Sequence, residues 1–538
     1  LIMCPKSVNV KVPHKSGFDK SFKHLFTSKV GTLVPVLCDE IIPDTKIHLR
    51  SAVMAQLPPL ATDTFMNVKL KFEAFFCPTR LLYGGFESWL THEKLKIPTQ
   101  SNSFDAYIPR LVLKNSGASA AIMVQPGSLL DYLGLKAVEP LSPDLQAFYN
   151  IFPVLCYHKV WEDYYRNPNI QSKCFAPILA GAQQSQIYVY NMPYLTLDSS
   201  ISESTIGYTP GAILADGVKL GDLRQRNFGF DYFTTAMSSA QRGDALKVSI
   251  DTSDNTFTIG ALRMSNSLQQ FAERNMMAGT RLQDYVKAHY GADLSSGVAQ
   301  RSIYLGSGEL DVYNKGVYTQ SALDFEPVLT GGRNPFIQSP ASKFGDAKVE
   351  GELSLVEEFT ASEPGYLMVM CSLVPKVTYS AGIRRMFRHY NKQNTQVDMA
   401  TPLLENVGNQ PIYADELTGN IPDYDDIFGY TDRYSEFKHV NDMLSGFVRD
   451  GQSLQAFALQ RAFEGTPQIS SEFLQIPTDF LDQVMSVDGE ISDFQYWADV
   501  YFDYKVSMPL SQYAIPSLQD PAYEHGRNVN IQVNGSSI

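Results

Sequence analysis

The sequence predicts a mainly β protein, a sandwich of antiparallel strands joined by long loop and helix-containing insertions. Strict alternation of apolar and polar residues, typical of a strand with one buried face, runs over residues 65–76 and again over residues 496–508. Long stretches rich in Pro, Ser and Gly separate the strand candidates. Because regular βα units are missing, a doubly wound parallel sheet is not expected.

The remaining elements follow from local patterns. The other strand candidates are bounded by Gly, Pro or Asp, which are typical turn residues, and cover residues 32–42, 246–250, 256–259, 352–359 and 366–374. Apolar residues at helical spacing occupy the intervals between strands. The four helix candidates are built on Val160, Trp161, Tyr164 and Tyr165; on Leu268, Phe271, Ala272 and Met276; on Leu282, Tyr285, Val286 and His289; and on Leu454, Phe457, Ala458 and Arg461.

Composition places the chain among ordered globular proteins, since 44% of the 538 residues are hydrophobic and only 19% are charged. At roughly 150 residues per domain the length alone would favour several domains. No internal repeat, low-complexity tract or linker divides the sequence, however. We therefore expect a basic N-terminal arm at residues 1–30 and a single domain with insertions at residues 31–538.

Charge is distributed unevenly along the chain. The net charge of −13 argues against a protein whose whole surface is coated by nucleic acid. The predicted arm is the exception, because its only acid, Asp19, is outnumbered by Lys6, Lys11, Lys15, Lys20, Lys23 and Lys29. These lysines predict a local contact with phosphates. The alternative interpretation is a solvated arm bound to another subunit.

Processing and membrane signals are weak. No signal peptide is recognisable, and the longest nearly apolar run, residues 366–375, is about half of the roughly 20 residues that a membrane span needs. The six cysteines are scattered without metal-type or disulfide-type spacing, so we expect them to be reduced and expect no membrane partner. Because the sequence begins with Leu1, we also expect further residues to precede it.

Catalytic motifs are missing from the sequence. No glycine is followed by lysine, which excludes a Walker A loop, and there is no G-x-G-x-x-G, H-E-x-x-H or G-x-S-x-G pattern. A site assembled from distant residues stays possible in a chain of this length. We propose no catalytic residue, no cofactor and no enzymatic activity.

Two charged clusters are candidate binding sites. The first, Asp423, Asp425 and Asp426, offers carboxylate oxygens to a hard cation such as Ca²⁺, but it lacks the twelve-residue loop spacing, and a solvated turn is the favoured interpretation. The second is a basic and aromatic cluster, residues 382–392. Its Arg384, Arg385 and Arg388 could meet phosphates while Phe387 or Tyr390 stacks on bases; a structural loop paired with the acidic excess is weighed equally.

Seven segments, in order, resemble the major capsid proteins of microviruses, small single-stranded DNA bacteriophages, and those of the gokushovirus branch above all. They are FFCPTRLLYGGFESWL (75–90), YHKVWEDYYRNPNI (157–170), DYFTTAMSSAQRGD (231–244), ERNMMAGTRLQDYVKAHYG (273–291), QRSIYLGSG (300–308), DDIFGYTDRYSEFKH (425–439) and MPLSQYAIPSLQDP (508–521). The resemblance covers nearly the whole chain.

The resemblance implies a viral jelly roll, of which sixty copies close a T=1 icosahedral capsid around a circular single-stranded DNA genome. It implies assembly in the bacterial host cytoplasm, a final place in the virion, and as partners the chain itself, the genome, small basic DNA-binding or minor virion proteins and a host surface receptor. The rival interpretations are a host-binding or carbohydrate-recognition protein on the same sandwich, and a hydrolase with dispersed catalytic residues.

Within this interpretation the basic arm and the cluster at residues 382–392 are expected on the inner surface, against the genome or, for the arm, a small basic packaging protein. Residues 176–225 form a probable outward insertion, because they have no arginine before Arg224 and are rich in Ser, Thr, Tyr and Gly. Relatives in the gokushovirus group carry an insertion that projects at the threefold axes. The alternative is that this segment packs along the shell surface between neighbouring copies.

Overall fold

The structure is a computed structural model of the whole chain. The residues that it describes are 6–12, 15–58, 60, 64–83, 86–91, 95–96, 103–104, 108–114, 124–136, 146–175, 186–187, 195–196, 207–208, 210–211, 214–242, 259–298, 300–320, 342–388, 409–419, 426–463, 465–485, 494–510 and 527–533.

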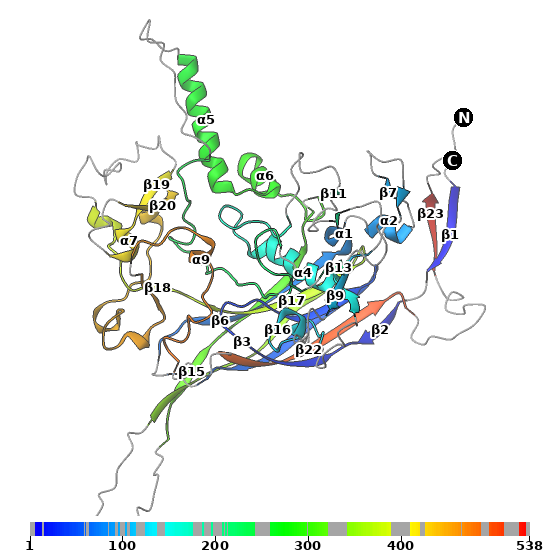
Figure 1. Cartoon of the computed structure of the whole chain (residues 1–538), viewed down its shortest axis with the longest axis horizontal. Helices are drawn as coiled ribbons and strands as arrows, with labels where there is room; N and C mark the ends of the chain where they lie inside the picture. Colours follow the sequence, from blue (N-terminus) through cyan, green and yellow to red (C-terminus); the bar gives the residue numbers. More distant parts are fainter. Residues whose placement is uncertain are drawn as a thin grey trace, which may run out of the picture.

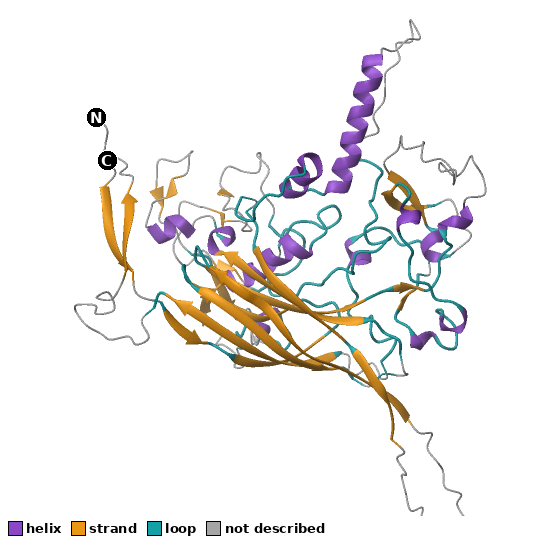
Figure 2. Cartoon of the chain, turned by 180° about the vertical axis from the view of Figure 1, so that it is seen from behind, coloured by secondary structure: helices purple, strands orange, loops and turns teal. Residues whose placement is uncertain are grey.

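Two facing sheets form the centre of the molecule (Figure 2). The larger sheet contains β3 (Phe22–Ser28), β22 (Tyr496–Met508), β5 (Lys46–Gln56) and β16 (Ser342–Thr360), and its ends are extended by β2 (Ser16–Asp19) and β15 (Tyr313–Gln320). The smaller sheet contains β4 (Val34–Ile41), β17 (Gly365–Pro375), β6 (Val68–Pro78) and β14 (Ile303–Asp311). Every pairing between these strands is antiparallel.

The order of the strands defines the topology. Numbered one to eight along the chain, β3, β4, β5, β6, β14, β16, β17 and β22 are arranged as 1-8-3-6 in one sheet and 2-7-4-5 in the other. Consecutive strands therefore alternate between the sheets, apart from the pair β6 and β14. This is the two-sheet arrangement of a jelly roll. The predicted fold class, a mainly β jelly-roll sandwich of antiparallel strands with long insertions, is confirmed.

Apolar side chains fill the space between the sheets. Alternate residues of each strand point inward, as with Leu49 of β5, Phe72 of β6 and Phe502 of β22, all of which are completely buried. Burying one such side chain contributes roughly 1.5–3 kcal/mol. The opposite face of the larger sheet carries polar and exposed residues, whereas every residue of β17 is buried. The smaller sheet is thus covered on both faces.

The sheets approach each other closely where β14 passes β16. A Cβ atom at Gly306 would lie 2.2 Å from the backbone oxygen of Leu355, and one at Gly351 would lie 2.4 Å from the side chain of Leu310. Backbone oxygen cannot move aside as a flexible side chain can. The close approach therefore requires glycine at position 306.

The predicted basic arm is largely part of the sandwich. Strand β2 pairs with residues 505–508 of β22, and β3 pairs with residues 496–502 of the same strand. Only β1 (Lys6–Val12) lies outside the two main sheets, pairing antiparallel with β23 (Arg527–Val533). Residues 16–28 are consequently edge strands rather than an extension from the domain.

The first long insertion, residues 79–302, connects β6 to β14 and covers the smaller sheet (Figure 1). Its helices are α1 (Thr79–Leu82), α2 (Phe86–Thr91), α3 (Leu129–Tyr132), α4 (Phe152–Val160), which continues as a π-helix at Trp161–Tyr165, α5 (Ile259–Ala278) and α6 (Leu282–Tyr290). Its strands are β7 (Leu95–Lys96), β8 (Ser103–Phe104), β9 (Arg110–Lys114), β10 (Gln146–Asn150), β11 (Gln186–Ile187), β12 (Leu195–Thr196) and β13 (Gly207–Tyr208).

The second long insertion, residues 376–495, connects β17 to β22, and part of it shares a small apolar core with Phe233 and Ala236 of the first insertion. Its elements are β18 (Thr378–Tyr379), a 3₁₀ turn at Arg385–Arg388, β19 (Asn409–Tyr413), α7 (Asp415–Thr418), β20 (Ile427–Asp432), α8 (Ser435–Lys438), two further 3₁₀ turns at Gly446–Val448 and Gln455–Phe457, β21 (Gln460–Arg461) and α9 (Ser471–Leu474). None of the helices that the structure describes is long and apolar enough to cross a membrane.

Most of the predicted elements are present. The strand predicted at residues 496–508 is β22, and those at 32–42, 65–76, 352–359 and 366–374 correspond to β4, β6, part of β16 and β17. Three helix predictions match α4 with its π-helix, α5 and α6. The strand predicted at residues 246–250 lies outside the described residues, as do residues 256–258.

Two element predictions are wrong. Ile259, expected to end a strand, begins α5 instead. The helix built on Leu454, Phe457, Ala458 and Arg461 is a 3₁₀ turn followed by the short strand β21. The reason is tertiary pairing, since the oxygen of Phe457 accepts a hydrogen bond from the Phe65 backbone and β21 pairs with β18. These bonds to distant segments replace the bonds of a helix.

Candidate functional site

The lysines of the N-terminal segment are partly neutralised by acids from other strands. Three ion pairs involve them: Lys15 with Asp44 at 2.7 Å, Lys23 with Asp499 at 2.6 Å, and Lys20 with Asp39. Lys29 is half-buried. Lys6 and Lys11 belong to β1, and their side chains lie outside what the structure describes. Whether these lysines contact DNA stays a prediction.

The structure separates the three arginines of the basic cluster. Arg388 is buried with its Nη1 2.7 Å from Oδ2 of Asp415, and its guanidinium lies 3.7 Å from the centre of the Tyr413 ring. Arg385 pairs with Glu416 at 3.0 Å and donates to the oxygen of Pro411 at 2.6 Å. These two arginines make the contacts that the structural interpretation predicts.

The third arginine, Arg384, is exposed, and a cleft of about 560 Å³ opens beside it. Tyr390, which was expected to stack on a base, lies outside the described residues. Exposed aromatic and cationic side chains form part of the lining of the cleft, together with the acids Glu416, Glu436 and Asp442. They are Arg384, Phe387, Phe437, His439 and Arg449. Cationic groups next to open aromatic rings are the elements of single-strand binding sites.

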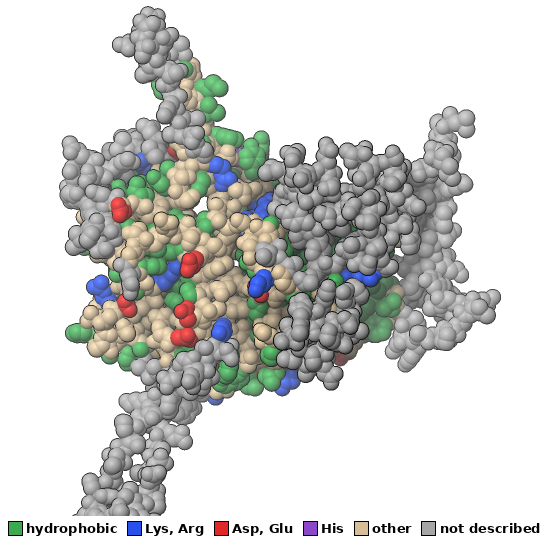
Figure 3. Space-filling model, in the orientation of Figure 1, with side chains coloured by type: hydrophobic (Ala, Val, Ile, Leu, Met, Phe, Trp, Pro, Cys, Tyr) green, Lys and Arg blue, Asp and Glu red, His purple; other side chains and the backbone are tan. Residues whose placement is uncertain are grey.

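The cleft is an isolated feature rather than part of a broad basic surface. On the face shown in Figure 3, Lys and Arg side chains are scattered singly, with Asp and Glu among them. The exposed face of the larger sheet is similarly mixed, since Asp503 of β22 lies opposite Arg50 of β5 in the strand register. On these two faces no broad basic patch is present among the described residues, in agreement with the net negative charge of the chain.

The acidic cluster is only partly described. Asp423 and Asp425 lie outside the described residues, and Asp426 is exposed with its backbone oxygen accepting a hydrogen bond from Ala414 at 2.8 Å. Within the described ranges, no group of three or more His, Cys, Asp or Glu side chains is placed to hold a metal ion. The cation site stays a prediction.

Residues 214–225, the C-terminal part of the predicted outward insertion, pack into the body of the molecule. Leu214 and Leu220 are buried in the apolar cluster that covers the smaller sheet, and Gln225 forms a β-bridge with Thr32. Strand β13 pairs with β9. Of residues 176–206 the structure describes only the backbone of β11 and β12, so an outward projection of that part stays a prediction.

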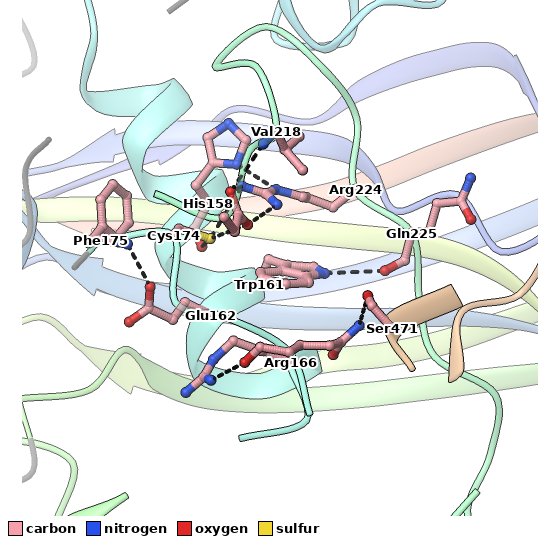
Figure 4. A network of polar contacts seen from close by, with 12 residues as sticks. His158, Trp161, Glu162, Arg166, Cys174, Phe175, Val218, Arg224, Gln225 and Ser471 are labelled. Carbon is pink, nitrogen blue, oxygen red and sulfur yellow. Dashed lines mark hydrogen bonds and ion pairs between the residues drawn. The ribbon is translucent and has the colours of Figure 1, made fainter. Parts of the chain in front are cut away.

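A buried polar network holds this segment against α4 (Figure 4). Nε of Arg224 donates to Nδ1 of His158 at 3.0 Å, and the Arg224 guanidinium also pairs with Asp216 and lies 4.6 Å from the Trp161 ring centre. The other His158 nitrogen, Nε2, lies 2.9 Å from the oxygen of Leu220. Because arginine can only donate, Nδ1 must be the acceptor, so Nε2 carries the proton.

His158, Cys174 and Asp216 are the residue types of a thiol hydrolase, but their arrangement does not support nucleophilic catalysis. Cys174 is completely buried, and burial raises the pKa of its thiol, so the reactive thiolate is disfavoured. Burial, followed by the charge of Arg224, lowers the pKa of His158 to about 3. Nδ1 of His158 faces arginine instead of the thiol. The network therefore fixes the chain in place.

Sequence reasoning missed this network and the cleft. His158 and Arg224 are 66 residues apart and match no spacing motif. The only signal was compositional, since Arg224 is the first arginine after a long stretch without one. In the cleft, Phe437, His439 and Arg449 come from a different part of the second insertion than Arg384, and only the fold brings them together.

Two facing sheets in the 1-8-3-6 and 2-7-4-5 order, with long insertions between strands, define a protein of the viral jelly-roll class. Residues 7–253 and 209–518 match the family model described as "Capsid protein (F protein)". The chain belongs to this family of phage capsid proteins, and its role is structural, not enzymatic.

Three capsid proteins are similar to this chain over almost their full length. The chain is 22% identical to the capsid protein VP1 of Chlamydia phage 1, over 94% of this chain and 96% of that protein. It is 24% identical to the capsid protein VP1 of Bdellovibrio phage phiMH2K, over 94% and 95%. The capsid protein VP1 of Spiroplasma virus 4 is 21% identical, over 96% of each chain. The predicted resemblance to microvirus capsid proteins is confirmed.

Proposed function

We propose that sixty copies of this chain assemble into a closed T=1 icosahedral shell around a circular single-stranded DNA genome. Assembly would take place in the cytoplasm of the bacterial host, and the product would be the virion capsid. The observation that carries the proposal is the jelly-roll strand order in a chain whose match to the capsid family covers both halves.

The distribution of exposed apolar side chains supports a role for the insertions in contacts between copies. Most of the large apolar side chains exposed among the described residues lie in the two insertions, for example Phe230 and Tyr290 in the first and Phe387, Val440 and Phe447 in the second. Exposed apolar surface of this kind marks protein interfaces. We infer that the sheets hold the fold while the insertions make the contacts between copies.

Sedimentation and electron microscopy of the purified protein test the shell. We expect a closed particle of megadalton mass that protects single-stranded DNA from nuclease. A small oligomer that binds glycans would favour the rival host-binding or carbohydrate-recognition protein and would overturn the proposal.

For the genome contact, we propose that the cleft beside Arg384 binds phosphate and base groups of the single-stranded DNA. The support is the exposed pair Arg384 and Arg449 next to the open rings of Phe387 and Phe437. The double variant Arg384→Ala with Arg449→Ala should form particles at normal yield with less packaged DNA. The matched variant Arg388→Ala removes a buried arginine of the same cluster and should lower particle yield instead. Unchanged DNA content in the double variant would contradict the contact.

A second genome contact is proposed for the N-terminal segment, because residues 1–30 hold six lysines and a single acid. A small basic DNA-binding or minor virion protein could share this inner surface. If the segment lies on the outer surface of the particle, this contact is excluded.

For the remaining partners, we propose that residues 176–206 project outward and contribute to binding a host surface receptor. Deleting residues 198–205, which spares the pairing of β13 with β9, should leave particles that assemble but lose a surface projection. Particles with an unchanged projection would show that another segment builds it. For the cation, titrating Ca²⁺ into particles carrying Asp423→Asn and Asp425→Asn tests the acidic cluster against wild-type particles.

A further inference from the structure

Helix α5 stands out from the body of the molecule (Figures 1 and 2). Its twenty residues correspond to a length of about 30 Å. The only buried residues of the helix are Glu273 and Met276, both near its C-terminal end. There the body is in contact with it, since Asn169 donates to the oxygen of Met276 at 3.2 Å and the Arg242 backbone donates to Ala272 at 3.2 Å.

One stripe of this helix has the spacing of a coiled-coil seam. Its members are separated by three, four, three, four and three residues: Ala261, Met264, Leu268, Phe271, Asn275 and Ala278. This is the heptad pattern by which helices pack together. Met264, Leu268 and Phe271 are 65%, 43% and 44% exposed. The buried residues Glu273 and Met276 fall outside the stripe, so the side of the helix that is most buried is not the seam.

The C-terminal part of the seam already packs against a helix of the same chain. The Phe271 ring lies 4.8 Å from the ring of His289 in α6, and Nε2 of His289 lies 2.7 Å from Oδ1 of Asn275. Because α6 ends nearby, the seam continues past it toward the N-terminus of α5 with its apolar side chains Met264 and Leu268 exposed. Within one copy, α6 thus covers only the C-terminal part of this packing surface.

The residues beside the seam indicate what completes it. In coiled coils these flanking positions usually carry charges that select a partner. Here they are small and uncharged, with the exception of Arg274: Gly260, Ser265, Ser267 and Ala272. Identical helices can therefore approach closely without repulsion between like charges. These flanking positions offer almost no charge by which a partner of different sequence could be selected. A second copy, in contrast, presents the same seam.

We propose that the seam of α5 packs against α5 of a second copy and forms a helical contact between subunits of the shell. The inference rests on the proposed self-assembly, which brings many copies of the helix together. An isolated helix of this length is only marginally stable in water. Packing against the same helix of a neighbour supplies the apolar cover for Met264 and Leu268.

A charge-insertion pair tests the seam. The variant Met264→Asp with Leu268→Asp places two carboxylates on it, and the control Asn266→Asp with Gln270→Asp places the same charges on the opposite side of the same half of the helix, where both residues are exposed. Circular dichroism and thermal unfolding of free subunits should be the same for both. Particle yield should fall at least tenfold in the seam variant and stay within about twofold of wild type in the control. Equal yields in the two variants overturn the inference.

Crosslinking in assembled particles provides a measurement that does not depend on folding of a charged variant. Particles of Leu268→Cys treated with a short bismaleimide should give covalent dimers, whereas particles of Gln270→Cys should not. The described native cysteines are buried or half-buried free thiols, which limits background reaction. Particles that form normally without Leu268→Cys dimers overturn this inference alone, whereas the absence of any particle from wild-type protein contradicts the proposed function.

Discussion

Both insertions bury charged pairs, but the first also packs a broad apolar surface onto the smaller sheet, whereas the outer part of the second has only a small apolar core. In the first, Phe75 of β6 and Met368 of β17 share one cluster with Tyr157 and Leu155 of α4. In the second, Arg388 and Asp415 are both buried and depend on each other. The first insertion thus covers the outer face of the smaller sheet. The part of the second insertion that holds Arg388 and Asp415 packs away from the sheets, whereas its residues 476–485 join the core between them.

The outer part of the second insertion contacts residues 231–237 of the first. Tyr379 donates to Asp231 at 2.8 Å, Tyr232 donates to Glu416 at 3.1 Å, and the backbones of Met237 and Tyr430 exchange hydrogen bonds of 2.8 Å. Damage to the first insertion should therefore also disturb this outer part of the second, while loss of the Arg388–Asp415 pair should stay local. Three predictions test this difference.

The largest effect is expected for Tyr157→Ala. The ring is completely buried, and its hydroxyl donates to Leu33 at 2.8 Å and accepts from the Arg224 backbone at 2.7 Å. Loss of the ring should lower the free energy of unfolding by about 5 kcal/mol, the upper end for aromatic residues replaced by alanine. Tyr157→Phe removes only the hydroxyl and should cost about 1–3 kcal/mol. Urea unfolding of free subunits measures both, and equal losses would contradict apolar packing as the main contribution.

A smaller and more local effect is expected for Arg388→Ala. It leaves the carboxylate of Asp415 buried without its arginine, which should cost about 3 kcal/mol. The double variant Arg388→Met with Asp415→Asn removes both charges. It should recover most of the stability that Arg388→Ala loses. Limited proteolysis should show cleavage confined to residues 376–495 in the single variant. Cleavage that begins equally in residues 79–302 would show that the two insertions are not separable.

Acidification should change the free energy of unfolding in opposite directions through titrating groups of the two insertions. The pKa of His158 is lowered to about 3 in the folded protein, so the unfolded state binds a proton that the folded state does not as the pH falls below about 6.5. As the pH falls through this range to ~3, His158 should therefore lower the free energy of unfolding by about 1.4 kcal/mol per pH unit. Burial raises the pKa of Asp415 and Glu416, so their contribution to stability is present at low pH and is lost as the pH rises.

The control for this pH dependence is His158→Gln, whose amide can still accept from Arg224 and donate to Leu220 but does not titrate. Thermal unfolding between pH 7 and 4 should show a steeper loss of stability in wild type than in the variant. Parallel pH profiles would show that His158 does not control the response.

Strands could be predicted from the sequence where one face is buried and the other is exposed to solvent. The alternation in β22 predicted that strand residue for residue. The central strand β5 was not predicted, although alternate residues of it point inward. The reason is that the polar residue Ser51 lies on its buried face, while the apolar residues Ala52 and Met54 lie on its exposed face. β14 was missed because glycines, which weaken a strand pattern, are needed for its close approach to β16.

The candidate site was less predictable than the fold. Arg384, Arg385 and Arg388 look equivalent in sequence, yet burial beside Asp415 and Glu416 assigns two of them to structure and leaves Arg384 exposed. These acids are about 30 residues away along the chain. Local patterns cannot show which cation meets which acid, because the pairing depends on how the second insertion folds back on itself.

We infer that the sheets fold the chain and that the insertions join its copies in a closed shell. Electron cryo-microscopy of assembled particles can decide this, because it shows which residues meet at every contact between copies. We expect an icosahedral shell in which most buried contact area comes from residues 79–302 and 376–495, with α5 packed against α5 of a neighbour. A shell whose contacts are made mainly by the exposed face of the larger sheet would contradict it.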